Sequence, residues 1–243
     1  MQFDVRNKFN IYIDFDGTIT NIDVGEQMFV KFGDPEKCKN VIDEWVDGKT
    51  SSRTVWIELC KTVSDFNEND FDKFIDEVEL DPYFLEFIEY CKSNNFAVTI
   101  LSDGLDYYIN KIASKNKFDD LKIFSNTLKV EKDKQLVPSF PFGDEECSNC
   151  ANCKRNHILN SSRDDEINIY IGDGYSDTCA AQYCDYIFAK RSLLKYCEKN
   201  RIPYYPFNNF SDVKKIVEQL SAKRKIKKRH QASLKRRDAY MQG

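Results

Sequence analysis

Carboxylate side chains gather in two short segments of this sequence. Asp14 and Asp16 belong to the sequence DFDGT, and Asp173 and Asp177 belong to the sequence GDGYSD. A hydroxyl group, that of Ser102, lies in a third segment between them. Carboxylates can act as nucleophiles or as general acids and bases, and their oxygens are the ligands that Mg²⁺ prefers. The residue types therefore indicate metal-assisted chemistry performed by aspartates.

Each of these segments directly follows an apolar run, at residues 9–13, 96–101 and 167–171. Such runs are typical of buried parallel strands. Ligands in open α/β sheets bind outside the carboxyl ends of the strands, so we expect the four carboxylates to face one crevice. Like charges repel at that range unless a cation lies among them, and Mg²⁺ is the counter-charge that we expect.

The elements around these strands predict the fold. Residues 22–78 have helical periodicity with breaks and no strand, and strands alternate with helices after residue 81. We expect an α/β fold with a Rossmann-like parallel sheet core flanked by helices, and a helical-bundle cap inserted after the first strand. The expected domains are an α/β core at 1–20 and 81–220, a cap at 21–80 and a basic C-terminal tail at 221–243.

Composition excludes several classes. The chain has 243 residues, of which 41% are hydrophobic and 31% charged, so disordered and collagen-like classes are excluded. It has only 2 histidines, His157 and His230, so a His-based triad or a multi-His metal site is excluded. The apolar run at 11–13 is far shorter than a signal peptide or membrane helix needs. We expect a cytoplasmic protein with no membrane partner.

The motifs together resemble those of the haloacid dehalogenase (HAD) superfamily of aspartate-nucleophile phosphatases, from about Asn10 to Leu220. DFDGT, Ser102, Lys154 and GDGYSD stand where that superfamily has its four motifs. The long helical stretch after the first motif resembles the cap of the phosphoserine-phosphatase-like branch. The resemblance implies an enzyme that hydrolyses a small phosphorylated metabolite with Mg²⁺.

The resemblance also implies a role for each motif residue. Asp14 would be the nucleophile that forms an aspartyl-phosphate, and Asp16 the general acid and base. The Mg²⁺ ligands that it implies are Asp14, Asp16 through its backbone carbonyl, Asp173 and Asp177. The residues that it implies for holding the transferring phosphoryl group are Ser102, Lys154 and Thr18.

Substrate choice is open at this point. Asp23 and Arg53 resemble the acidic and basic residues that meet the substrate in phosphoserine phosphatases, the alternative being two exposed helix-face charges. The sequence DYIFAKRSLL resembles the phosphatases of 2-hydroxy-3-keto-5-methylthiopentenyl-1-phosphate, in methionine salvage. Asp103, which precedes Gly104 in the substrate-binding region, replaces a glycine common in relatives. The alternative substrates are phosphoserine, phosphocholine, phosphoethanolamine and other small phosphorylated metabolites.

Three cysteines and a histidine have spacings that could surround a metal ion. Cys147, Cys150, Cys153 and His157 would suit a tetrahedral structural Zn²⁺. The alternatives are an occasional disulfide and reduced thiols.

The charge is uneven along the chain. Residues 211–243 hold 11 Lys and Arg against 3 Asp and Glu, a net charge of +8, whereas the whole chain is −4. Clustered cations suit an anionic polymer, so a second function class is a non-catalytic or nucleic-acid-binding protein that acts through its tail. The alternative, which we favour, is that the tail is a solvated or frayed terminal helix. The partner that we expect for the protein is then a small phosphorylated metabolite rather than nucleic acid.

Overall fold

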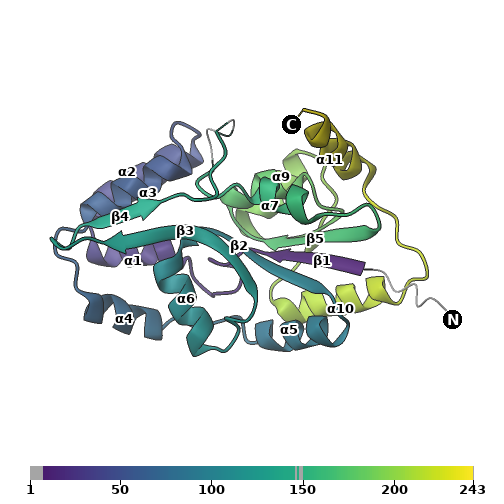
Figure 1. Ribbon diagram of the computed structural model, residues 1–243, viewed down its shortest axis with the longest axis horizontal. Helices are drawn as coiled ribbons and strands as arrows, with labels where there is room; N and C mark the ends of the chain where they lie inside the picture. Colours follow the sequence, from purple (N-terminus) through teal and green to yellow (C-terminus); the bar gives the residue numbers. More distant parts are fainter. Residues whose placement is uncertain (1–7, 146, 148–149, 243) are drawn as a thin grey trace. The chain divides into compact units, whose positions relative to one another are not determined.

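The computed structural model describes residues 8–145, 147 and 150–242. Seven strands form one mostly parallel sheet in the order β4-β3-β2-β1-β5-β6-β7 (Figure 1). The predicted α/β fold is therefore confirmed. The chain divides into two compact units, one of Met1–Asp14, Asp81–Thr99 and Lys154–Gly243, the other of Phe15–Leu80 and Ile100–Cys153. Strand β2 (Ala97–Leu105) begins in the first unit and ends in the second.

The first unit is built on parallel strands. Strand β1 pairs with β5 from Lys8↔Glu166 to Ile13↔Ile171, and β5 pairs in turn with β6. Helices α7 and α9 lie on one side of these strands and α5 and α10 on the other (Figure 1). The bounds are β1 (Lys8–Ile13), α5 (Phe84–Ser93), α7 (Lys154–Ser161), β5 (Glu166–Gly172), η1 (Tyr175–Asp177), α8 (Thr178–Ala181), β6 (Tyr186–Ala189), α9 (Arg191–Lys199), β7 (Tyr205–Pro206), α10 (Phe210–Ser221) and α11 (His230–Gln242).

Continuous burial explains why β1 and β5 occupy the centre of the sheet. Every residue from Phe9 to Ile13 is buried, and so is every residue from Ile167 to Gly172. Strands covered by helices on both faces are mostly apolar, and the only polar side chains within these two runs are the buried Asn10 and Asn168 and the tyrosines. The first polar residues after them, Asp14 and Asp173, therefore mark the carboxyl edge of the sheet.

The second unit holds four consecutive helices and a hairpin. Each of the four helices is preceded by an N-cap residue, whose side chain accepts a hydrogen bond from a backbone N–H of the first turn. These residues are Asp23, Asp34, Ser51 and Asn67. The bounds are α1 (Val24–Phe32), α2 (Pro35–Val46), α3 (Ser52–Thr62), α4 (Glu68–Asp76), α6 (Asp106–Lys115), β3 (Lys122–Val130) and β4 (Leu136–Ser139).

Two details differ from the expected elements. Strand β2 continues through Ser102 to Leu105 instead of ending at residue 101, because Leu105 is fully buried and anchors the extended chain. The polar segment after β3 contains strand β4, which pairs antiparallel with β3 across a turn where Lys134 has a φ of 64°. A strand of four residues that includes Pro138 carries too weak a pattern to be predicted.

The basic tail ends in the expected terminal helix, most of whose cations are exposed, but one side of this helix is docked on the first unit. Residues 230–242 form helix α11, and Ala232 and Arg236 in it are 0% and 7% exposed. The Arg236 guanidinium lies 3.0 Å from the Asp185 carboxylate, which fixes the helix to the first unit. The physical reason is that a buried carboxylate of the core supplies a partner for one of the tail's cations.

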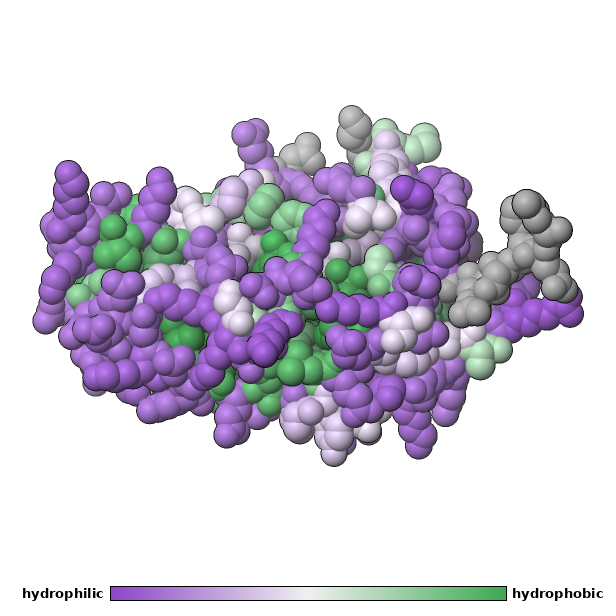
Figure 2. All heavy atoms as spheres, turned by 60° about the horizontal axis from the view of Figure 1, so that its bottom comes forward, coloured by the Kyte–Doolittle hydropathy of each residue, from purple (hydrophilic) through white to green (hydrophobic). Residues whose placement is uncertain are grey.

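No helix among the described residues is long and apolar enough to cross a membrane. Figure 2 shows one face of the molecule, where hydrophilic side chains cover most of the surface and hydrophobic ones are visible between them.

Candidate active site

Three buried carboxylates meet in the first unit, at the ends of β1 and β5. The Asp14 N–H donates to the carbonyl of Ile171 at 2.9 Å, which extends the pairing of the two strands by one residue. Asp14, Asp173 and Asp177 each offer one carboxylate oxygen, and these oxygens lie within 4.8 Å of one another. All three residues are at most 6% exposed. We call this cluster the acidic centre; it contains three of the carboxylates expected at the strand ends.

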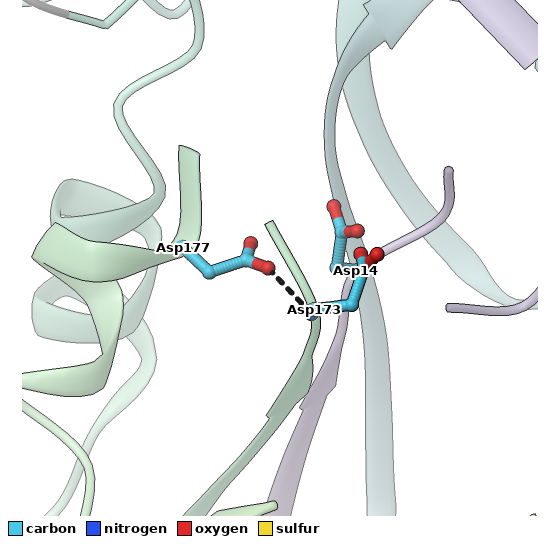
Figure 3. Close-up of side chains that lie close together, drawn as sticks. All are labelled: Asp14, Asp173 and Asp177. Carbon is cyan, nitrogen blue, oxygen red and sulfur yellow. Dashed lines mark hydrogen bonds between the residues drawn. The ribbon is translucent and has the colours of Figure 1, made fainter. Parts of the chain in front are cut away.

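Asp177 reaches the acidic centre through the turn η1. Its Oδ2 accepts hydrogen bonds from the N–H groups of Asp173 and Gly174, both at 2.9 Å, and Figure 3 shows the first of them. A Cβ on Gly172 would lie 2.4 Å from that same oxygen. The turn therefore needs glycine at 172, because the Asp177 carboxylate occupies the space of a side chain.

Lys154 is the buried cation of the acidic centre. It is the first residue of α7, and it is 1% exposed. Its ammonium donates to Asp14 Oδ1 at 2.5 Å and to Asp177 Oδ1 at 2.7 Å, with a longer hydrogen bond of 3.2 Å to Ser176 Oγ. One lysine thus joins two aspartates that lie far apart in the sequence.

Burial and charge set the protonation of these groups. Burial raises the pKa of Asp14 well above its usual range, the Asp177 carboxylate raises it further, and Lys154 opposes both. Burial alone would lower the pKa of the Lys154 ammonium, but Asp14 and Asp177 raise it above its usual value. Lys154 and Arg191 bring two positive charges to three carboxylates, which leaves one negative charge without compensation, and the ligand atoms are carboxylate oxygens. The set fits a hard divalent cation such as Mg²⁺.

Two residues of the acidic centre carried no sequence signal. The hydroxyl of Tyr170 donates to Asp177 Oδ1 at 2.5 Å, and Arg191 Nη1 donates to Asp173 Oδ2 at 3.0 Å. Tyr170 belongs to the apolar run of β5 and has the periodicity of a core residue. Arg191 is one of 36 Lys and Arg residues in the chain, so its type alone does not distinguish it. Its position as the first residue of α9, just after β6, brings its guanidinium to Asp173.

Asp16 belongs to the second unit, where it is surrounded by donors. Its Oδ1 accepts from the Val24 N–H at 3.0 Å, and its Oδ2 accepts from Tyr108 Oη at 2.7 Å and Ser102 Oγ at 3.3 Å. Burial raises the pKa of Asp16 to about 7, and the Asp23 carboxylate contributes to the rise. A carboxyl with that pKa exchanges its proton near neutral pH, as a general acid and base must.

Gly104 is required by the close approach of the groups around Asp16. A Cβ at this position would lie 1.8 Å from Tyr108 Oη and 2.7 Å from Asp16 Oδ2. The Gly104 N–H also donates to Ser102 Oγ at 2.9 Å, which orients that hydroxyl. Tyr108, which sequence reasoning missed, is fully buried and lies on α6 among its core-facing residues.

The other predicted residues next to the first motif have backbone roles. Asp23 is the N-cap of α1 and accepts from the Glu26 N–H at 2.8 Å. Thr18 is fully buried, and its N–H donates to the Phe15 carbonyl at 3.2 Å in the turn that follows Asp14.

Asp103 connects three segments of the second unit. Its carboxylate accepts hydrogen bonds from Ser52 Oγ, in the first turn of α3, and from the Asn152 N–H at 2.8 Å. Its carbonyl accepts from Asn126 Nδ2 at 2.6 Å. Asn152 Nδ2 donates in turn to the Ser102 carbonyl at 2.7 Å. Asp103 and Asn152 together therefore hold the backbone that follows the Ser102 side chain.

Arg53 holds the loop that carries the cysteine cluster. Its Nε donates to the Cys150 carbonyl at 3.1 Å and its Nη2 to the Asp144 carbonyl at 2.7 Å. Among the described residues, the acidic centre is the group of potential metal ligands found together, and no disulfide joins two cysteines. A structural Zn²⁺ is therefore not supported at the residues predicted to bind it, Cys147, Cys150, Cys153 and His157.

The parallel sheet has aspartates at its carboxyl edge, and comparison with known families assigns this arrangement to a phosphatase. The chain belongs to the family described as "Putative Phosphatase", whose model matches residues 9–202. It is an enzyme, a phosphoric monoester hydrolase.

Relatives and solved structures agree with this class. The 2-hydroxy-3-keto-5-methylthiopentenyl-1-phosphate phosphatase of Bacillus cereus is 31% identical over 205 residues, 84% of this chain and 93% of that protein. Pdp3-interacting factor 1 of Schizosaccharomyces pombe is 28% identical over 232 residues, 88% of this chain and 97% of that protein. A solved phospho-aspartyl intermediate analogue of phosphoserine phosphatase has a TM-score of 0.66 and 20% identity, covering 88% of this chain and 99% of its own.

Proposed function

We propose that this protein hydrolyses a small phosphate monoester in a Mg²⁺-dependent reaction through an aspartyl-phosphate on Asp14. The observation that carries the proposal is the acidic centre, in which Lys154 bridges Asp14 and Asp177 at 2.5 and 2.7 Å inside the first unit. Phosphate monoesters hydrolyse extremely slowly without a catalyst, so a covalent intermediate and charge stabilisation are both needed.

The residues that we propose for holding Mg²⁺ are Asp14, Asp173 and Asp177, with the Asp16 backbone carbonyl. When bound, the ion would neutralise charge on the nucleophile and on the phosphoryl oxygens. The N–H groups of Asp173 and Gly174 hold Asp177 in place, which pre-orients the ligand set before binding.

The protein's own groups divide the remaining work. Asp14 attacks phosphorus, and the Lys154 ammonium orients its carboxylate by donating to Oδ1. Lys154 and Ser102 would hold the phosphoryl oxygens. Asp16, two residues further along the chain, would protonate the leaving oxygen and then take the proton of the water that opens the acyl phosphate.

We propose 2-hydroxy-3-keto-5-methylthiopentenyl-1-phosphate as the substrate, because the Bacillus cereus enzyme named for it is 31% identical over most of both chains. Thr18, Asp23, Arg53, Asp103 and Gly104 remain proposed substrate-site residues.

The proposed domains are a core at 1–20 and 81–220, a cap at 21–80 and a tail at 221–243. We also propose a cytoplasmic location.

Replacing the nucleophile tests the mechanism. Asp14→Asn should lower turnover of p-nitrophenyl phosphate by on the order of 10⁴-fold, and EDTA should abolish wild-type turnover until Mg²⁺ is restored. Asp165→Asn is the matched control, because Asp165 has a side chain that is 63% exposed and pairs with the equally exposed Lys8. Turnover by a folded Asp14→Asn protein at the wild-type rate would exclude Asp14 as the nucleophile.

A substrate screen tests the second part of the proposal. Wild-type kcat/KM should be highest for the methionine-salvage phosphate when it is compared with phosphoserine, phosphocholine and phosphoethanolamine. A higher kcat/KM for one of the other three compounds would contradict the proposed substrate but not the proposed mechanism.

A further inference from the structure

The C-terminal helix α11 is attached to the first unit by hydrogen bonds near both of its ends. The Tyr186 hydroxyl donates to the Lys227 carbonyl at 3.0 Å just before the helix, and the Tyr240 hydroxyl donates to the Leu159 carbonyl at the far end of it. In Figure 1 the helix lies beside α7. The tail is therefore held at both ends, and its middle faces α8.

Two arginines of the tail occupy the carboxyl end of α8. Arg229 Nη2 donates to the carbonyls of Ala181 and Gln182 at 2.6 and 2.7 Å, and Arg236 Nη1 donates to the next carbonyl, that of Tyr183. The last carbonyls of a helix have no partners within it and carry its partial negative charge. Two guanidinium groups on three consecutive carbonyls therefore form a C-terminal clamp, which we call the arginine clamp.

A buried ion pair anchors the arginine clamp to the sheet. The side chains of Arg236 and Asp185 are 9% and 0% exposed, and Nη2 lies 3.0 Å from Oδ1. The other oxygen of Asp185 accepts from the Asn168 N–H of β5 at 3.0 Å. The clamp is thus tied to the strand that leads into the acidic centre.

The opposite end of α8 is the acidic centre itself. Asp177 is the N-cap of α8, and the helix has only four residues. A helix of that length is not stable alone, so its position depends on what holds its two ends. Lys154, Tyr170 and two backbone N–H groups hold the Asp177 end. The arginine clamp holds the other.

We propose that Arg229 and Arg236 are positioning residues for Asp177, acting through α8. The proposal rests on the proposed function, in which Asp177 belongs to the Mg²⁺ site. Loss of the clamp loosens the carboxyl end of α8, so that the Asp177 carboxylate is held less firmly in the geometry that binds the ion. Outer contacts of this kind typically change metal affinity by about 10- to 100-fold.

The test compares full-length Arg229→Met, Arg236→Met and Arg236→Lys with the wild-type chain. Arg237→Met is the matched control, because the Arg237 side chain is 68% exposed and its ion pair with Asp238 is 3.9 Å long. The dissociation constant of Mg²⁺ is measured by isothermal titration calorimetry, and kcat and KM for p-nitrophenyl phosphate are measured at saturating Mg²⁺. We expect a Mg²⁺ dissociation constant about tenfold higher in both Met variants, lower kcat and a KM within twofold of the wild-type value.

Rescue separates positioning from stability. Arg236→Lys keeps a cation beside Asp185 and should recover most of the Mg²⁺ affinity. Arg229→Met leaves the Arg236–Asp185 pair intact and removes a guanidinium whose buried Nε and Nη1 have no hydrogen-bond partner among the described residues. This variant should therefore fold even if Arg236→Met does not.

Two results would overturn the proposal. One is a folded Arg229→Met protein whose Mg²⁺ dissociation constant and kcat match those of Arg237→Met. The other is a fall in thermal stability of the Met variants with no change in Mg²⁺ binding, which would make the clamp purely structural. A wild-type chain without Mg²⁺-dependent turnover would instead refute the proposed function, so the two failures are distinguishable.

Discussion

Replacing Lys154 by Met tests the electrostatics of the acidic centre directly. Lys154 is 1% exposed and forms ion pairs of 2.5 Å with Asp14 and 2.7 Å with Asp177, whose side chains are 6% and 0% exposed. Methionine has a similar length and no charge. The substitution therefore leaves three buried carboxylates together with no buried cation among them.

The expected loss of stability is large. Removing one partner of a buried ion pair costs about 3 to 5 kcal/mol, because the remaining charge is buried without compensation. For a chain of this size each kcal/mol lowers the melting temperature by about 2 to 4 °C, so the fall should be about 6 to 20 °C. Mg²⁺ should raise the melting temperature of Lys154→Met more than that of the wild-type protein, because it replaces the missing positive charge.

Thermal unfolding followed by circular dichroism, with EDTA and with Mg²⁺, measures both effects. Lys8→Met is the matched control, since Lys8 pairs with Asp165 at 2.9 Å but both side chains are 63% exposed. Exposed pairs contribute little, so the control should melt within about 2 °C of the wild type. If Lys154→Met melts as the control does in EDTA, the Lys154 ammonium does not stabilise the buried carboxylates of the acidic centre.

Three further predictions concern other contacts. Gly172→Ala places a Cβ 2.4 Å from Asp177 Oδ2 and should lower kcat at least about tenfold with helix content retained; wild-type kcat would contradict it. Tyr108→Phe removes the 2.7 Å donor to Asp16 and should cost about 1 to 3 kcal/mol of unfolding free energy, so equal stability in urea would count against it. Burial raises the pKa of Cys91 to about 12, whereas an exposed thiol has a pKa of about 8.5, so the contribution of this thiol to folding stability should fall as pH rises from about 8.5 toward 12. The Cys91 thiol should also resist iodoacetamide at pH 9 until urea unfolds the protein. Labelling of the folded chain would refute its burial.

Much of the fold was predictable because its strands are short apolar runs that end at acidic residues. The runs of β1 and β5 are buried throughout, so hydrophobicity and β propensity agree for both strands. Strand β4 was missed because it is a short edge strand beside β3, and its residues carry no alternation of their own. A hairpin of that kind depends on the turn at Lys134 more than on its own sequence.

The acidic centre was predictable for a geometric reason. Asp14 and Asp173 each follow a parallel strand, and parallel strands that pair bring their carboxyl ends together. The tyrosines of the two units were not predictable. Tyr170 and Tyr108 occupy positions where a core residue is expected, and only the tertiary structure directs their hydroxyls to Asp177 and Asp16.

The tail shows why net charge alone is a poor guide to the role of a basic segment. Its +8 charge predicts exposed cations, yet Arg229, Ala232 and Arg236 recur at intervals of three and four residues, the spacing of one helix face. Ala232 and Arg236 on that face are buried, whereas Lys223 and Arg237 off it are exposed. The acceptors of the two arginines are mainly backbone carbonyls, which leave no mark in the sequence. Periodicity therefore identifies a docking face even in a segment rich in cations, while the partner of that face has to come from the structure.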